Sequence, residues 1–166
     1  MGCYLLVLDG RRGTYEAELV RMVWFAALRA AGDVDNDGRD ELVLFHHLPP
    51  PGRLESLLQV VKVDRGGLVT VAELPVEGWT GAWLVDVTGD GRPELLVGFG
   101  DTLTAYRFQG GEAMAVWRVK GWPVRGVLPV DRDGDGVVDA LVLLGPRGAA
   151  EVAQGSAGWR GRPPSR

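Results

Sequence analysis

Short apolar runs separated by glycine-containing turns recur along the whole chain, and they are typical of β-strands rather than helices. Residues 42–45, 95–99 and 141–144 are continuously apolar, which indicates strands buried on both faces. Residues 56–63 and 102–108 alternate apolar and polar side chains, as strands with one face in a core do. The pattern predicts an all-β fold.

The runs group into units of four predicted strands, in which each continuous run is the second strand. The alanines in the first strand of the first unit, with Gly32 directly after it, suit a crowded, innermost position. We expect residues 155–166 to form a disordered tail. The other predicted segments are first strands at 25–31, 82–85 and 125–130, third and fourth strands at 56–63, 68–74, 102–108 and 113–119, two strands at 3–10 and 14–24, and one short strand at 149–154.

An acidic nine-residue segment lies between the first two predicted strands of each unit. The three segments start at Asp33, Asp86 and Asp131 and read DVDNDGRDE, DVTGDGRPE and DRDGDGVVD. They hold twelve of the 22 carboxylates in a chain whose net charge is only −4, so the acidity is concentrated. Their spacings of 53 and 45 residues match a four-stranded propeller blade of roughly 40 to 50 residues. The chain is therefore predicted to be a repeat protein.

The spacing of oxygen-bearing residues in these segments predicts three metal sites. Side chains at positions 1, 3, 5 and 9 and a backbone carbonyl at position 7 can surround a hard cation that takes about 6 to 8 oxygens. Donors that are all oxygen, without histidine or cysteine, favour calcium over zinc or copper. The predicted ligands are Asp33, Asp35, Asp37, the Arg39 carbonyl and Glu41; Asp86, Thr88, Asp90, the Arg92 carbonyl and Glu94; and Asp131, Asp133, Asp135, the Val137 carbonyl and Asp139.

Two other structures are compatible with the start of these acidic segments: an EF-hand and a plain turn. An EF-hand needs a glutamate at position 12, where this chain has Leu44, Val97 and Val142, so that motif is excluded. Plain turns in which aspartate bonds its own backbone remain an alternative. Within the calcium interpretation the second segment is expected to bind most weakly, because Thr88 replaces a carboxylate there.

The segments AAGDVDNDGRDELVLF, LVDVTGDGRPELLVGFG and LPVDRDGDGVVDALVLLG resemble the calcium loops of the FG-GAP/VCBS repeats, which read approximately GDxNxDGxxDLxV. The resemblance extends over residues 1–150, but its specific part is about 15 residues in each copy. It implies β-propeller blades of four antiparallel strands, with calcium in the loop between the first two strands. Up to three Ca²⁺ ions per chain are expected.

Blade boundaries follow from the repeats: strands of a split blade at 1–24, blades at 25–78 and 79–121, and the other strands of a split blade at 122–154. These strands make about three blades, whereas propellers typically close with about 4 to 8. An open arc exposes edge strands that invite pairing. Either the chain is part of a longer propeller, or two copies form a homodimer that closes a six-bladed ring; we favour self-association.

No catalytic constellation is recognisable, so an enzyme is not expected. The single cysteine, Cys3, excludes a disulfide framework, and the adjacent His46 and His47 are expected to be solvent-exposed. No apolar stretch approaches the roughly 20 residues of a membrane helix, and nothing indicates a nucleic-acid partner. The sequence favours a non-catalytic calcium-binding propeller module that binds a protein or glycan, in adhesion for example.

Two further functions remain open: an architectural module that self-assembles, and a piece of a calcium-dependent enzyme acting on polysaccharides. Family resemblance implies an extracellular or cell-surface location, yet the opening residues do not read as a signal peptide. The compartment is therefore left open, as is the identity of any ligand.

Overall fold

The computed structural model describes residues 2–9, 16–24, 26–46, 56–64, 67–76, 79–155 and 158–162, and side chains within 26–46, 56–64, 67–76 and 81–153. These residues form fourteen strands, β1 to β14, and no helix. All the strand pairs in the described residues are antiparallel. The predicted all-β fold is confirmed.

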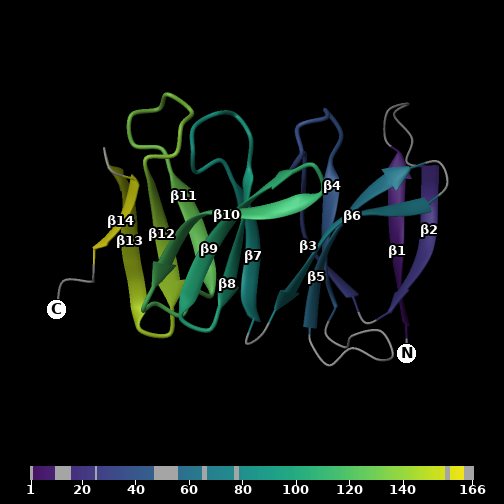
Figure 1. The fold of residues 1–166 in the computed structure, drawn as a ribbon, viewed down its shortest axis with the longest axis horizontal. Coiled ribbons are helices and arrows are strands. Elements are labelled where there is room, and N and C mark those ends of the chain that lie inside the picture. The colour runs from purple at the N-terminus through teal and green to yellow at the C-terminus, as the bar shows by residue number, and fades with distance from the viewer. Residues whose placement is uncertain are drawn as a thin grey trace.

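The strands form a two-stranded sheet and three four-stranded sheets, and strand order within each follows the chain. The four sheets stand side by side in chain order (Figure 1). Their strands are β1 (Gly2–Asp9) and β2 (Glu16–Trp24); then β3 (Ala26–Gly32), β4 (Glu41–His46), β5 (Ser56–Asp64) and β6 (Gly67–Val76); then β7 (Trp79–Val85), β8 (Glu94–Phe99), β9 (Thr102–Gln109) and β10 (Glu112–Lys120); and then β11 (Gly126–Val130), β12 (Ala140–Gly145), β13 (Gly148–Gly155) and β14 (Gly158–Arg162). We call the last three the first, second and third sheets.

The continuously apolar strands lie between two layers of core, as their composition predicts. In β8, Leu95 and Val97 pack in the core shared with the first sheet. Leu96, which points to the opposite face, packs in the core shared with the third sheet. All three side chains are fully buried. A strand covered on both faces cannot alternate apolar with polar residues, which explains the run.

First strands of neighbouring sheets contact each other, β3 with β7 and β7 with β11. The small residues of β3 permit this approach. A Cβ atom added to Gly32 would lie 3.0 Å from Cδ1 of Leu84 in β7, which is tight for a carbon contact. The crowding expected at the first strand is therefore present between the first and second sheets.

Two expectations about the chain are wrong. Residues 158–162 were expected in a disordered tail, but they form β14 on the edge of β13, with Gly155 paired to Gly158. The glycine-rich composition gave no sign of a buried face, and main-chain pairing supplies the order instead. The unit predicted as a split blade at 122–154 is thus a four-stranded sheet, which removes the complementary strand ends on which the dimeric six-bladed ring depended.

The second error concerns His46, which is buried rather than solvent-exposed. It is the last residue of β4, and one of its ring nitrogens lies 3.1 Å from Oε1 of Gln59 in the adjacent β5. The second strand extends one residue beyond its apolar run and carries the imidazole into the sheet. His47 lies outside the described residues.

No helix in the described part of the chain is long and apolar enough to cross a membrane.

Candidate metal centre

The three acidic segments form loops that join the first and second strands of the three four-stranded sheets. We call them the first loop (33–41), the second loop (86–94) and the third loop (131–139), each counted through position 9. All three emerge on the same side of the row of sheets, at the top of Figure 1. The predicted strand-loop-strand arrangement is confirmed.

Glycine at position 6 gives each loop its turn. Gly38, Gly91 and Gly136 have φ angles of 84°, 82° and 88°, in the left-handed region that side chains disfavour. In the first loop Asn36 also has a positive φ of 61°, which asparagine tolerates better than most residues. These turns aim successive backbone N–H groups at the first aspartate of the loop.

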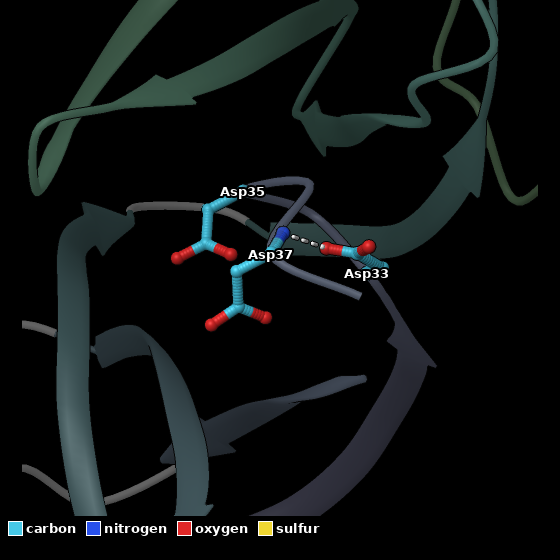
Figure 2. Close-up of side chains that lie close together, drawn as sticks. All are labelled: Asp33, Asp35 and Asp37. Carbon is cyan, nitrogen blue, oxygen red and sulfur yellow. Dashed lines mark hydrogen bonds between the residues drawn. The ribbon is translucent and has the colours of Figure 1, made fainter. Parts of the chain in front are cut away.

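Asp33 organises the first loop by accepting hydrogen bonds from the backbone. Its Oδ1 accepts from the Asp37 N–H at 3.1 Å and its Oδ2 from the Gly38 N–H at 2.8 Å. Figure 2 shows the first of these bonds and the side chains of Asp35 and Asp37 extending in one direction from the loop. One carboxylate oxygen from each of the three aspartates lies within 4.8 Å of the others. The cluster could hold a metal ion.

Glu41 brings a carboxylate to this cluster from the interior of the protein. The residue is fully buried at the start of β4, and its Oε2 accepts a hydrogen bond of 2.9 Å from the Val34 N–H. Its Oε1 is buried and has no hydrogen-bond partner among the described residues, and the same holds for Oδ1 of Asp35. Burial raises the pKa of Glu41, and the negative charge of Asp35 adds to the effect. Two buried carboxylate oxygens therefore lack the partners that such atoms normally have.

Lys62 of β5 is a member of this site that sequence reasoning missed. It is paired across the sheet with Glu41. Its Nζ lies 2.6 Å from Oδ2 of Asp35, 2.5 Å from Oδ2 of Asp37 and 3.9 Å from Oε1 of Glu41. The hydrogen bond from Lys62 holds the pKa of Asp37 below its usual value, and the two aspartates raise that of Lys62. The ammonium neutralises only part of the charge of four carboxylates.

The second loop keeps the backbone frame but has a different interior. Oδ1 of Asp86 accepts from Gly89 N–H at 2.7 Å, and Oδ2 accepts from Gly91 N–H at the same distance. Glu94 is fully buried, and its Oε2 accepts from the Val87 N–H at 3.0 Å. Its Oε1 is paired with Nη2 of Arg107, at 2.5 Å. Arg107, in β9, was also missed by sequence reasoning.

The third loop again gathers three carboxylates. Asp131 accepts from the Gly134 and Gly136 N–H groups at 2.8 Å each, and these bonds lower its pKa. Oxygens of Asp131, Asp133 and Asp139 lie within 4.8 Å of one another. Oδ2 of Asp139 accepts from the Arg132 N–H at 2.8 Å.

The structure brings some of the predicted carboxylates close together and leaves others apart. The first loop brings together Asp33, Asp35 and Asp37, with the buried Glu41 beside them. The third brings together Asp131, Asp133 and Asp139, whereas Oδ1 of Asp135 accepts a hydrogen bond from the Val137 N–H at 2.8 Å. The carboxylates of the second loop, Asp86, Asp90 and Glu94, are not among the groups close enough to share an ion in the described residues. The roles of the Arg39, Arg92 and Val137 carbonyls remain predictions.

Donor chemistry in the first loop fits a hard divalent cation. Every candidate ligand atom is oxygen, and two of these oxygens are buried without a hydrogen bond from the described residues.

Comparison with protein-family models finds no matching family, and comparison with curated proteins finds no similar sequence.

Proposed function

We propose that this chain is a calcium-binding β-propeller repeat module of the FG-GAP/VCBS type, non-catalytic, whose surface binds a protein or a glycan. Calcium would sit in the first and third loops, where three carboxylates gather, and fix the edge of the sheet there. The residues that would hold it in the first loop are Asp33, Asp35, Asp37 and Glu41, which bind and orient the ion through carboxylate oxygens.

The observation that carries this proposal is the buried Glu41. An ionised carboxylate costs several kcal/mol to remove from water unless it is paired. Within the part of the chain that the structure describes, Oε1 of Glu41 has no hydrogen bond, and its nearest cation, Nζ of Lys62, is 3.9 Å away. Plain turns would account for Asp33, whose oxygens cap the backbone, but not for a buried glutamate whose second oxygen is left without a hydrogen bond. A divalent ion supplies the missing partner.

The arrangement of the sheets supports the propeller part of the proposal. Consecutive four-stranded sheets each run in chain order, and their first strands contact each other while their fourth strands, β6, β10 and β14, also contact. Blades stacked around an axis place equivalent strands next to each other in this way. A likeness of topology does not determine the ligand, so the protein or glycan partner is proposed on the resemblance alone.

Calcium binding can be tested by native mass spectrometry of the chain in calcium and in chelator. We expect calcium-bound species for the wild-type chain, and a stoichiometry lower by one ion for Asp33→Asn. Asp101→Asn is the matched control, because Asp101 is an exposed aspartate outside the acidic loops; it should bind as many ions as the wild type. Wild-type protein that remains metal-free in calcium would overturn the proposal.

A further inference from the structure

The first and second loops each receive a basic side chain from the third strand of their own sheet. The two basic residues stand at the same position in their sheets. In the first sheet β4 pairs with β5 so that Glu41 faces Lys62. In the second sheet Leu95 faces Tyr106, so the next position brings Glu94 to Arg107. The register of the second and third strands therefore aims one cation at position 9 of each loop.

The two cations satisfy their loops to different degrees. Nη2 of Arg107 lies 2.8 Å from Oγ1 of Thr88, 2.9 Å from Oδ2 of Asp90 and 2.5 Å from Oε1 of Glu94, and Nε of Arg107 lies 3.1 Å from that same oxygen. These are the side chains predicted to bind calcium at positions 3, 5 and 9. Both oxygens of Glu94 are bonded, one to Arg107 and one to Val87.

Guanidinium groups suit this role better than ammonium groups. Arg107 presents several N–H donors in a fixed planar fork, so one side chain can bond several oxygens at once. Lys62 lies 3.9 Å from Oε1 of Glu41, too far to bond it, and no other described residue donates a hydrogen bond to that oxygen. In the third sheet Ala140 faces Ala153, so the position next to Asp139 falls to Gln154, which carries no charge.

We infer that Arg107 is the resident cation of the second loop: its guanidinium takes the place of a metal ion, so the loop folds without calcium. This inference rests on the proposed function, because it assigns calcium to the other two loops. Threonine in place of a carboxylate at position 3 fits this assignment, because arginine brings one positive charge to the loop where calcium would bring two. The second loop then has the backbone of a calcium loop but holds an arginine side chain in place of the ion.

The inference is tested by counting calcium ions bound to full-length variants, again by native mass spectrometry. Arg107→Met removes the resident cation and should bind one more calcium ion than the wild-type chain. Arg118→Met is the matched control, because Arg118 bonds Thr104 on the neighbouring strand and not the loop; its count should be unchanged. An unchanged count for a folded Arg107→Met chain would contradict the inference.

A second variant keeps the inference falsifiable if Arg107→Met does not fold. Asp90→Asn weakens a predicted ligand of the second loop without removing the arginine, and it should leave the calcium count at the wild-type value. A loss of one ion from Asp90→Asn would mean that the second loop holds calcium, which refutes the role of Arg107 while leaving the proposed function standing. If instead the wild-type chain bound no calcium, the proposed function would fail, and a gain of one ion by Arg107→Met would still support the inference.

Discussion

The first and second loops share a backbone frame but differ in how each satisfies its buried glutamate. Glu41 and Glu94 occupy the same position, are equally buried, and accept the same hydrogen bond from the residue after the first aspartate. Oε1 of Glu94 is bonded to Arg107, whereas no described residue donates a hydrogen bond to Oε1 of Glu41. The loop sequence determines the backbone conformation, and the facing residue on the third strand determines which cation occupies the loop.

The largest effects expected from this difference come from the two glutamates. Glu94→Ala leaves Arg107 and the Val87 N–H without their acceptor and should destabilise the fold by about 3 kcal/mol, with or without calcium. At neutral pH, Glu41→Gln should lower stability only in calcium, where the lost ion costs about 2.7 kcal/mol at a calcium concentration 100 times the Kd.

Urea unfolding of both variants, in calcium and in chelator, measures these differences. Glu112→Gln, at an exposed position on β10, is the control. A calcium-dependent penalty for Glu94→Ala, or an equal penalty for Glu41→Gln in chelator, would break the comparison between the two loops.

A smaller effect is expected from making the first loop resemble the second. Lys62→Arg places a guanidinium opposite Glu41, where it can bond more carboxylate oxygens than the ammonium does. Calcium must then displace a better-bonded cation, so affinity at this loop should fall about tenfold, or ~1.4 kcal/mol. Isothermal titration calorimetry compares calcium affinity between Lys62→Arg, in which a cation competes with calcium, and Lys62→Met, in which the competing cation is removed. Unchanged or tighter calcium binding by Lys62→Arg would count against competition at this site.

The smallest effect concerns pH in the absence of calcium. Burial raises the pKa of Glu41, so the folded chain binds this proton more tightly than the unfolded chain does. In chelator, the contribution of Glu41 to stability should therefore grow as pH falls from neutral towards 4.5, its ordinary pKa. Asp35 and Lys62 face the same carboxylate. Lys62, with its raised pKa, stays charged over this range, and the stability contributed by Asp37, with its lowered pKa, is lost only at lower pH.

The measurement is the difference in unfolding free energy between the wild-type chain and Glu41→Gln as a function of pH. That difference should shift in favour of the wild-type chain as pH falls over this window. A difference that does not vary with pH would show that the environment of Glu41 favours neither protonation state.

The strands were predictable because their burial is encoded locally. Residues 95–99 are continuously apolar since they touch cores on both sides, and the Asp-rich loops carry a ligand spacing that is visible in one segment. Order in residues 158–162 was not predictable, because main-chain pairing with β13 leaves no mark in a sequence of Gly, Trp and Arg.

The basic residues of the site were missed for a reason that differs between the loops. Phe99 and Thr102 pair around the two-residue turn at Gly100 and Asp101, and this hairpin fixes the register that brings Arg107 to Glu94. That partner was within reach of sequence reasoning. For Lys62, residues 47–55 separate β4 from β5, a connection too long for its sequence to give the register. Only the folded sheet pairs Lys62 with Glu41.

The most direct test of the account is the position of the bound ions. Crystals of the full chain soaked in a lanthanide, a hard cation that binds oxygen ligands as calcium does, would locate the sites by anomalous scattering. We expect peaks in the first loop, beside Glu41, and in the third, and none in the second, where Arg107 stays on Glu94. A peak in the second loop with Arg107 displaced, or no peak beside Glu41, would contradict the account.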